Sequence, residues 1–231
     1  MLRARVVMSK PLFPMLCALL AMLVSVAIAE SPSNADADGF VDLFANGDFS
    51  LWKVDGTNDT DRARQTELWS IDDGVISASG KKYGFIRYDR ELRDFELRLE
   101  YQLDKGGNSG IGLRGAIYKG GGSRPSAAGY ELQLLADAGR TPNKHSSMSL
   151  YRYVAPSENA VRPPGEWNEV EVICRGPHIR VTVNGKTVQD LDQTTIDAIK
   201  NKPLHGYLLL QNHGSPVKFR HVRLKELDDA S

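Results

Sequence analysis

The sequence predicts an all-β fold, a single antiparallel β-sandwich, from three observations. Short segments alternate apolar and polar residues, turn-forming residues separate these segments, and helical periodicity is almost absent. The one helical candidate, residues 194–200, is limited to about one or two turns because Pro203 follows it. The alternation is clearest in residues 94–104, where the apolar positions of one face are Phe95, Leu97, Leu99, Tyr101 and Leu103.

Other segments along the chain show the same β pattern and complete the sandwich. Asn184-Gly185 is a two-residue hairpin signal that leads into residues 186–188. Two Gly-rich connections, residues 105–110 and 119–129, are typical of flexible hairpin loops, and such loops also rim binding sites in sandwiches. The further predicted strands cover residues 110–114, 130–135, 170–174, 178–184, 207–213 and 217–227.

The charge balance excludes one class of partner. The chain has 231 residues, with 29 Lys and Arg against 29 Asp and Glu, and the part after residue 29 is slightly acidic. Such a chain lacks the positive field that phosphate backbones require, so we expect no nucleic-acid partner. One sandwich domain over residues 38–228 accounts for the length, and no feature of the sequence indicates an oligomeric state.

Residues 1–29 have the three parts of a secretory signal peptide. Basic residues occur in the first ten positions, residues 12–28 are apolar apart from Ser25, and Ala27-Ile28-Ala29 is a cleavage pattern. We therefore expect an exported protein, periplasmic or extracellular, with no stable membrane insertion after signal removal. The alternative is a retained membrane anchor, because the apolar run is nearly long enough to span a bilayer. Residues 30–37 are polar and small and are expected to form a flexible leader.

Removal of the predicted signal peptide, residues 1–29, also removes Cys17 and leaves Cys174 as the one remaining cysteine. No intramolecular disulfide is then possible. Cys174 ends an apolar strand pattern and is expected to be a buried core residue rather than a nucleophile. No pair of cysteines or closely spaced histidines indicates a zinc site.

Strand parity separates a core face from a polar face in residues 130–135. The two central leucines of this segment are assigned to the core, so Glu131 and Gln133 share the opposite face. Asp137 has the same parity if the strand stays regular. In residues 110–114 the same argument places Arg114 on the polar face, beside two glycines that would leave room for a ligand.

Further polar residues are expected on the same face. In residues 207–213 the apolar parity leaves Gln211 and His213 opposite the core, together with Tyr207. Tyr151 and Asn108 come from neighbouring segments. An ordinary solvated sheet surface is the simplest alternative, but such surfaces are usually rich in Lys, Glu and Thr. Amides, Tyr and His beside glycines suit hydrogen bonding and stacking to sugar hydroxyls, so a carbohydrate substrate is the predicted ligand.

Several short segments, spread in order over nearly the whole chain after the predicted signal peptide, carry a family resemblance. They are Phe40-Val41-Asp42-Leu43-Phe44, Asn108-Ser109-Gly110-Ile111, Leu113-Arg114-Gly115, Gly129-Tyr130-Glu131-Leu132-Gln133, Val154-Ala155-Pro156-Ser157, Pro163-Pro164-Gly165-Glu166-Trp167-Asn168, Asn184-Gly185, Leu210-Gln211-Asn212-His213-Gly214-Ser215-Pro216-Val217 and Phe219-Arg220. In these segments the sequence resembles the 3-keto-disaccharide hydrolase domain family, which is common in exported bacterial proteins. The resemblance implies a concanavalin A-like jelly roll and a glycosidase acting on 3-keto-glycosides.

The chain departs from the jelly-roll β-glucanases, which typically place Glu, Asp and Glu along one strand. Glu131 matches the first position, but Gln133 stands at the second and an apolar residue at the third. A retaining double displacement needs two carboxyl groups about 5 Å apart. Only Asp137 could supply the second one locally, so an ordinary retaining glucanase is not expected.

A 3-keto sugar suits a site with one carboxylate, because the ketone at C3 acidifies the proton on C2. The family match and the face argument assign Glu131 as base or acid/base and His213 as the partnering acid. Arg114 or a bound divalent cation would stabilise the enolate, although no dense ligand spacing supports a metal. The residues expected to position the sugar are Asn108, Gln133, Tyr151 and Gln211. A non-catalytic carbohydrate-binding module and a structural or adhesive sandwich domain remain the alternatives.

Overall fold

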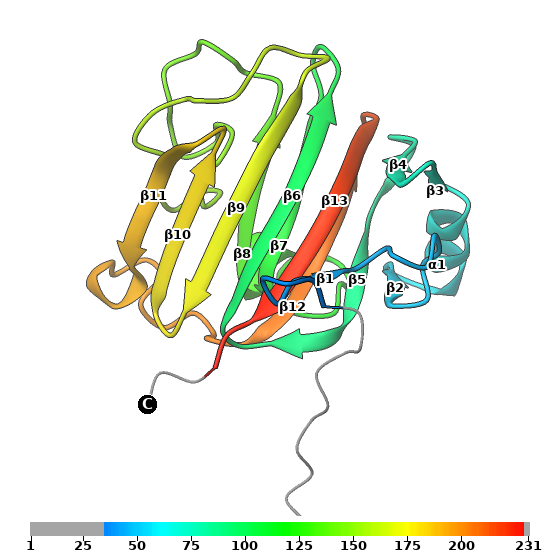
Figure 1. Cartoon of the computed structure of the whole chain (residues 1–231), viewed down its shortest axis with the longest axis horizontal. Helices are drawn as coiled ribbons and strands as arrows, with labels where there is room; N and C mark the ends of the chain where they lie inside the picture. The colour runs from blue at the N-terminus through cyan, green and yellow to red at the C-terminus, as the bar shows by residue number, and fades with distance from the viewer. Residues whose placement is uncertain (1–34, 229–231) are drawn as a thin grey trace, which may run out of the picture. The chain divides into compact units, whose positions relative to one another are not determined.

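The computed structural model describes residues 35–228 (Figure 1). The predicted signal peptide, residues 1–29, and most of the predicted leader, residues 30–37, lie outside the described residues. No helix within the described part of the chain is long and apolar enough to cross a membrane.

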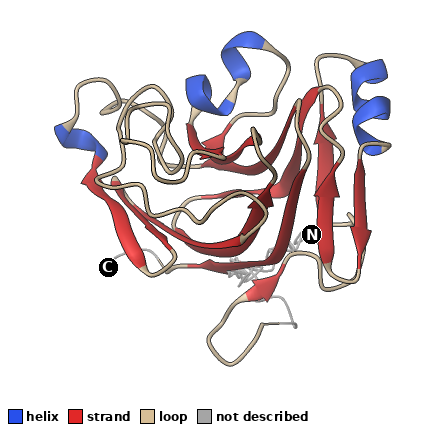
Figure 2. Cartoon of the chain, turned by 90° about the horizontal axis from the view of Figure 1, so that it is seen from above, coloured by secondary structure: helices blue, strands red, loops and turns tan. Residues whose placement is uncertain are grey.

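The described residues form two antiparallel β-sheets. The larger sheet has the strand order β11-β10-β9-β6-β13-β4-β3, and β1 pairs with β13 beside this path (Figure 1). The smaller sheet has the order β2-β5-β12-β7-β8. The two sheets form the stacked layers of Figure 2, and the predicted antiparallel sandwich is confirmed.

The strands of the larger sheet are β1 (Val41–Asp42), β3 (Trp69–Asp72), β4 (Val75–Ala78), β6 (Phe95–Leu103), β9 (Trp167–Arg175), β10 (His178–Val183), β11 (Lys186–Asp192) and β13 (Val217–Glu226). Those of the smaller sheet are β2 (Trp52–Asp55), β5 (Tyr83–Leu92), β7 (Asn108–Gly115), β8 (Tyr130–Leu135) and β12 (Gly206–His213).

The core lies between the sheets and follows the predicted parity. In β6 every second residue from Phe95 is buried, and the residues between them are half-buried. Leu132 and Leu134 of β8 and Leu208 and Leu210 of β12 are all 0% exposed and belong to the same core cluster. The face of the smaller sheet that points away from this core is therefore the one that carries the polar residues.

Replacing Leu132 by Ala should lower the free energy of unfolding by about 2–5 kcal/mol. The change removes buried apolar contacts and leaves a cavity that the two sheets can only partly close. Chemical denaturation followed by tryptophan fluorescence measures the loss. An unchanged transition would mean that the faces of β8 are inverted, which would also misplace Glu131.

The helical elements differ from the sequence expectation. In place of the predicted helix at 194–200, the chain forms a 3-10 turn, η2 (Gln193–Thr195), followed by a hydrogen-bonded turn at residues 197–201. The structure adds α1 (Asp59–Thr66), which Asn58 caps by accepting the Asp61 N–H, and the sequence prediction missed it. The buried face of α1 is a single glutamine, Gln65, so no apolar period marks this helix.

The two Gly-rich connections behave differently from each other. Residues 105–107 form a tight turn into β7. The longer connection folds into η1 (Gly121–Ser123) and α2 (Pro125–Ala128), which packs on β7 and β8. This second connection therefore lies over part of the polar face and is not a plain hairpin loop.

The segment between β8 and β9 adds main-chain pairing to the edge of the smaller sheet. The Gln133 N–H donates to the Ser149 carbonyl at 3.0 Å, and the Tyr151 N–H donates to the Glu131 carbonyl at 2.9 Å. Tyr151 is placed beside Glu131 by these bonds. The predicted hairpin between β10 and β11 is confirmed, with positive φ at Asn184 and Gly185.

Candidate active site on the smaller sheet

Glu131 lies on the outer face of β8 and is only 6% exposed. The neighbouring strand is β7. Gln133 of β8 pairs with Gly110 of β7, and Glu131 of β8 pairs with Gly112. The Glu131 side chain leans over Gly110, since a Cβ on that glycine would lie 3.1 Å from Oε1 of Glu131. The absent side chain at position 110 thus makes room for the carboxylate.

Gln211 on β12 holds this carboxylate. Its Nε2 donates to Oε1 of Glu131 at 2.8 Å and to the Tyr83 hydroxyl at 3.4 Å. The side chain is 1% exposed, and its Oε1 has no hydrogen-bond partner within the described structure. A buried acceptor without a partner is costly, so this oxygen is suited to accept from a sugar hydroxyl or a water.

A second amide pair lies beside the first. Nε2 of Gln133 donates to Oδ1 of Asn108 at 2.9 Å. Asn108 is held by Ser215, whose hydroxyl accepts the Asn108 N–H at 2.7 Å and donates to its carbonyl at 2.9 Å. On the other side of Glu131, the Tyr151 ring meets the His145 ring edge-on at 5.1 Å. Amides and an aromatic ring therefore surround the carboxylate.

His213 ends β12 on the same face and is half-buried. Its ring packs edge-on against Tyr83 with 5.1 Å between the ring centres. No direct hydrogen bond joins His213 to Glu131 among residues 35–228, and the two are connected through Tyr83 and Gln211. The structure brings six predicted residues to one face: Asn108, Glu131, Gln133, Tyr151, Gln211 and His213.

Arg114 does not join them, and its predicted place on the polar face is wrong. Between the pairs Tyr207–Gly115 and Leu209–Gly112, β7 contains one residue more than β12. Arg114 sits in this bulge with φ +51°, which reverses the parity expected for a regular strand. Its guanidinium is fully buried and pairs with Asp94 at 3.2 Å. It also donates to two main-chain carbonyls, so the enolate-binding role has no structural basis.

Asp137 is not on the face either. β8 ends at Leu135, and Oδ2 of Asp137 accepts the Ser147 N–H at 3.1 Å. Burial, with a further contribution from the negative charge of Asp137, raises the pKa of Tyr101 inside the core. The carboxylate thus lies near Tyr101 and away from the outer face.

The space above Gly112 is also filled by protein. A Cβ there would lie 2.7 Å from Cδ1 of Leu209 and 3.0 Å from Cγ of Pro125. The glycine lets α2 approach the sheet, so the expectation that it leaves room for a ligand is wrong.

The sequence prediction missed the aromatic side of the face. Phe85, Tyr118 and Leu209 form a buried cluster against which Tyr83 and Tyr207 pack. Arg124 lies above it, with its guanidinium carbon 5.0 Å from the centre of the Tyr83 ring. Residues 84–88 of β5 are all buried, so the apolar and polar alternation that reveals a half-buried strand is absent there. Tyr83, Phe85 and Arg87 occupy every second position of β5. This spacing was the sequence signal that could have predicted a strand with these side chains on one face.

A second carboxylate on this face, Asp55, is already engaged. It accepts from Nε of Arg87 at 3.2 Å and from the Tyr118 N–H at 2.9 Å. It pairs across β2 and β5 with Phe85, which separates it from Gln211. Burial raises the pKa of Asp55, against the opposing effects of these two partners.

A family model described as a 3-keto-alpha-glucoside-1,2-lyase-like domain matches residues 39–225. The chain belongs to this family. A relative from Bacteroides thetaiotaomicron, named 3-keto-disaccharide hydrolase, is 26% identical over 238 residues, covering 84% of this chain and 80% of the relative. The predicted family is confirmed.

Solved structures show the same fold. A candidate glycosyl hydrolase from Parabacteroides distasonis matches with a TM-score of 0.69 and 24% identity, over 83% of this chain and 96% of that one. Another from the same strain matches with a TM-score of 0.63 and 26% identity, over 76% and 99%. The jelly-roll form of the sandwich is thereby confirmed for this family member.

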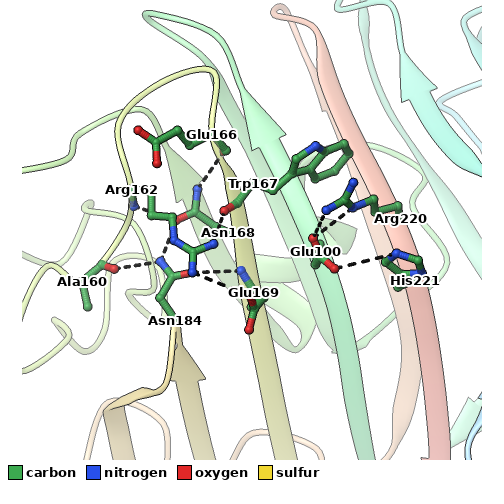
Figure 3. Close-up of polar contacts among 10 residues, drawn as sticks. All are labelled: Glu100, Ala160, Arg162, Glu166, Trp167, Asn168, Glu169, Asn184, Arg220 and His221. Atoms are coloured by element: carbon green, nitrogen blue, oxygen red, sulfur yellow. Dashed lines mark hydrogen bonds and ion pairs between the residues drawn. The ribbon is translucent and has the colours of Figure 1, made fainter.

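One segment of the family resemblance, residues 163–168, has a structural role. Oδ1 of Asn168 accepts a hydrogen bond from the Arg162 main-chain N–H at 2.7 Å and a second one from Nδ2 of Asn184 at 2.9 Å (Figure 3). Asn184 also donates to the Ala160 carbonyl at 2.9 Å. These bonds tie the long loop before β9 to the β10–β11 hairpin, on the side of the larger sheet.

The outer face of the larger sheet carries a groove of about 620 Å³, lined mainly by charged side chains. Within the groove, Arg98 contacts Glu171 at 3.1 Å. Glu100 of the groove also contacts Arg220, which is not a lining residue, at 2.6 Å (Figure 3). The guanidinium of Arg220 also covers the Trp167 ring at 4.2 Å. This face is therefore the ordinary solvated surface that the sequence of β6 predicts.

Cys174 is a free thiol buried in the core, as expected. Burial raises the pKa of the Cys174 thiol to about 11, so the thiol stays protonated near neutral pH and does not serve as a nucleophile. Within residues 35–228, no three His, Cys, Asp or Glu side chains gather closely enough to hold a metal ion. The divalent cation considered for the enolate remains an untested prediction.

Proposed function

We propose that this chain is an exported enzyme that cleaves 3-keto-glycosides or 3-keto-disaccharides by elimination followed by hydration. The family membership supports the substrate class, and the name of the Bacteroides relative supports cleavage of a 3-keto-disaccharide. The observation that carries the mechanism is the carboxylate of Glu131, buried on the polar face and held by Gln211 beside an unsatisfied amide oxygen.

The reaction needs one base, one acid and a site for negative charge. Glu131 takes the C2 proton, and the C–H electron pair forms the enolate, with the charge on O3. The C3 carbonyl then re-forms, a C1–C2 double bond forms, and the C1–oxygen bond breaks. His213 donates a proton to the leaving oxygen. Water adds across the double bond, with OH at C1 and H at C2, to give the free 3-keto sugar.

The arrangement suits this route better than a double displacement. A retaining glycosidase needs two carboxyl groups about 5 Å apart. On the described face, Asp55 is bonded to Arg87 and Tyr118 and lies behind Phe85, and Asp89 of β5 also pairs with Arg87, at 3.3 Å. Elimination needs only the one carboxylate that is available. A reaction that stops at the elimination product is that of a lyase, as in the name of the family model. A reaction that continues to hydration is that of a hydrolase, as in the name of the Bacteroides relative.

A carbohydrate-binding module is the second candidate. The aromatic cluster around Tyr83 and the two amide pairs favour it, because rings and amides bind sugars without any base. Saturable binding of a 3-keto-glycoside without turnover would support it.

Turnover of a panel of 3-keto-glycosides, followed by NMR with and without a chelator, tests the proposal. We expect release of the free aglycone and of a 3-keto sugar, and no cleavage of the matching glycosides that carry a hydroxyl at C3. Cleavage of the C3-hydroxyl glycosides at the same rate would contradict it, because their C2 proton is not acidic. Activity that is lost with the chelator and restored by added metal would show that the reaction requires a divalent cation.

Export is part of this proposal and rests on the pattern of residues 1–29. We expect the mature protein to begin at Glu30, directly after Ala27-Ile28-Ala29. Amino-terminal sequencing of the protein from the periplasmic or culture fraction measures this. A membrane-bound product that still begins at Met1 would contradict the prediction and support the retained anchor.

A further inference from the structure

Tyr83 and Glu131 are hydrogen-bonded to the same amide nitrogen. Nε2 of Gln211 lies 2.8 Å from Oε1 of Glu131 and 3.4 Å from the Tyr83 hydroxyl. The two oxygens come from β8 and β5, which lie on opposite sides of β12 and β7 in the sheet. The carboxylate and the phenol therefore flank one point on the face, close enough to contact neighbouring atoms of one sugar ring.

The Tyr83 ring is held firmly. It meets three other rings edge-on, with centres 5.4 Å from Phe85, 5.6 Å from Tyr118 and 5.1 Å from His213. Packing on several sides restricts the ring, so its hydroxyl stays beside Gln211. A fixed donor costs no reorganisation when charge develops on a substrate.

The Tyr83 hydroxyl also keeps its proton. Burial, together with the negative charge of Glu131, raises the pKa of the Tyr83 phenol above its ordinary value, although the nearby Arg124 opposes this effect. At neutral pH the group is thus a hydrogen-bond donor and not a base.

Arg124 supplies a positive charge that no carboxylate neutralises within residues 35–228. Its side chain is exposed, and its guanidinium lies 5.0 Å from the Tyr83 ring centre. Two other arginines of this sheet are neutralised: Arg87 pairs with Asp55, and Arg114 pairs with Asp94. Among the described residues, Arg124 is therefore an unpaired cation next to Tyr83 that can approach a bound anion. Arg152 lies over the Tyr151 ring instead.

We propose that Tyr83 and Arg124 form the oxyanion site for the C3 oxygen of the substrate, a role that the sequence assigned to Arg114. This inference rests on the proposed function. As Glu131 takes the C2 proton, the C–H electron pair enters the C2–C3 bond and the carbonyl pair moves onto O3. Tyr83 and Arg124 donate hydrogen bonds to O3 and transfer no proton. These donors stabilise the negative charge that develops on O3, and this charge forms only where C3 carries a ketone, so the site selects a 3-keto sugar.

Exchange of the C2 proton tests this step separately from cleavage. The probe is 1-deoxy-3-keto-glucose, which has the ketone but no leaving group at C1, in D2O followed by NMR. The wild-type protein is expected to catalyse the exchange. Removing one oxyanion donor costs about 10²–10³-fold in rate, so we expect Tyr83→Phe to slow exchange about 10²-fold with little change in KM. Arg124→Gln should slow it too, and Arg124→Lys should recover part of the rate.

Tyr88→Phe is the matched control, because Tyr88 lies on the same strand, β5, but belongs to the core cluster between the sheets. It should exchange at the wild-type rate, and the melting temperatures of all variants should match. Exchange at the wild-type rate in both Tyr83→Phe and Arg124→Gln would overturn the oxyanion site and leave the proposed function intact. A wild-type protein that neither exchanges the probe nor cleaves 3-keto-glycosides would overturn both.

Discussion

Glu131→Gln is expected to lower turnover of a 3-keto-glycoside by about 10²–10⁴-fold, the range that a positioned general base contributes. The amide keeps the size of the side chain and can still accept from Nε2 of Gln211, so the fold and substrate binding should survive. Steady-state kinetics should therefore show a loss in kcat with a nearly constant KM. Calorimetric titration with the substrate should show that affinity is retained.

Solvent deuterium identifies the step that is lost. In D2O the wild-type product should carry deuterium at C2, because the proton on C2 is removed and later replaced. Deuterium placed at C2 of the substrate should slow the reaction if proton removal limits the rate. A direct displacement at C1 would leave the C2–H bond intact, with no deuterium from the solvent.

Glu166→Gln is the matched control for the same chemical change. Glu166 is exposed in the loop before β9, on the side of the larger sheet (Figure 3). Its turnover should equal that of the wild-type protein. Full activity in Glu131→Gln would remove the proposed base and favour a metal-bound hydroxide.

Strand parity predicted most of this face because β8 and β12 are regular where the argument needs them. β8 turns Leu132 and Leu134 to the core, and β12 turns Leu208 and Leu210 to it. This leaves Glu131, Gln133, Gln211 and His213 outside. The same argument failed for Arg114, since the bulge in β7 inserts one residue and reverses the face. Nothing local in the sequence marks that bulge, which depends on the pairing with β12.

The sequence did not predict the aromatic half of the site, for a different reason. β5 is covered on both faces, so its buried residues run without alternation and the strand was not recognised. Tyr83 meets Gln211 at a separation of 128 residues, and only the register of β5 on β12 brings them together. Arg124 reaches the face from the connection between β7 and β8, whose folding as η1 and α2 depends on packing against the sheet.

Arg114→Met should lower the free energy of unfolding by about 3–5 kcal/mol, the cost of removing one partner from a buried ion pair. Methionine fills similar space, but it leaves the Asp94 charge uncompensated and the Arg93 and Gly176 carbonyls without their donor.

The chain cannot shift to absorb this change, because the Arg114 carbonyl is enclosed by two glycines. A Cβ on Gly129 would lie 2.2 Å from that oxygen, and a Cβ on Gly206 would lie 2.6 Å from it. Chemical denaturation measures the loss, and the double variant with Asp94→Asn should recover part of it by removing the unpaired charge. Activity per folded molecule should stay at the wild-type level. A stable Arg114→Met protein that has lost turnover would instead return Arg114 to the active site and contradict its structural role in the bulge of β7.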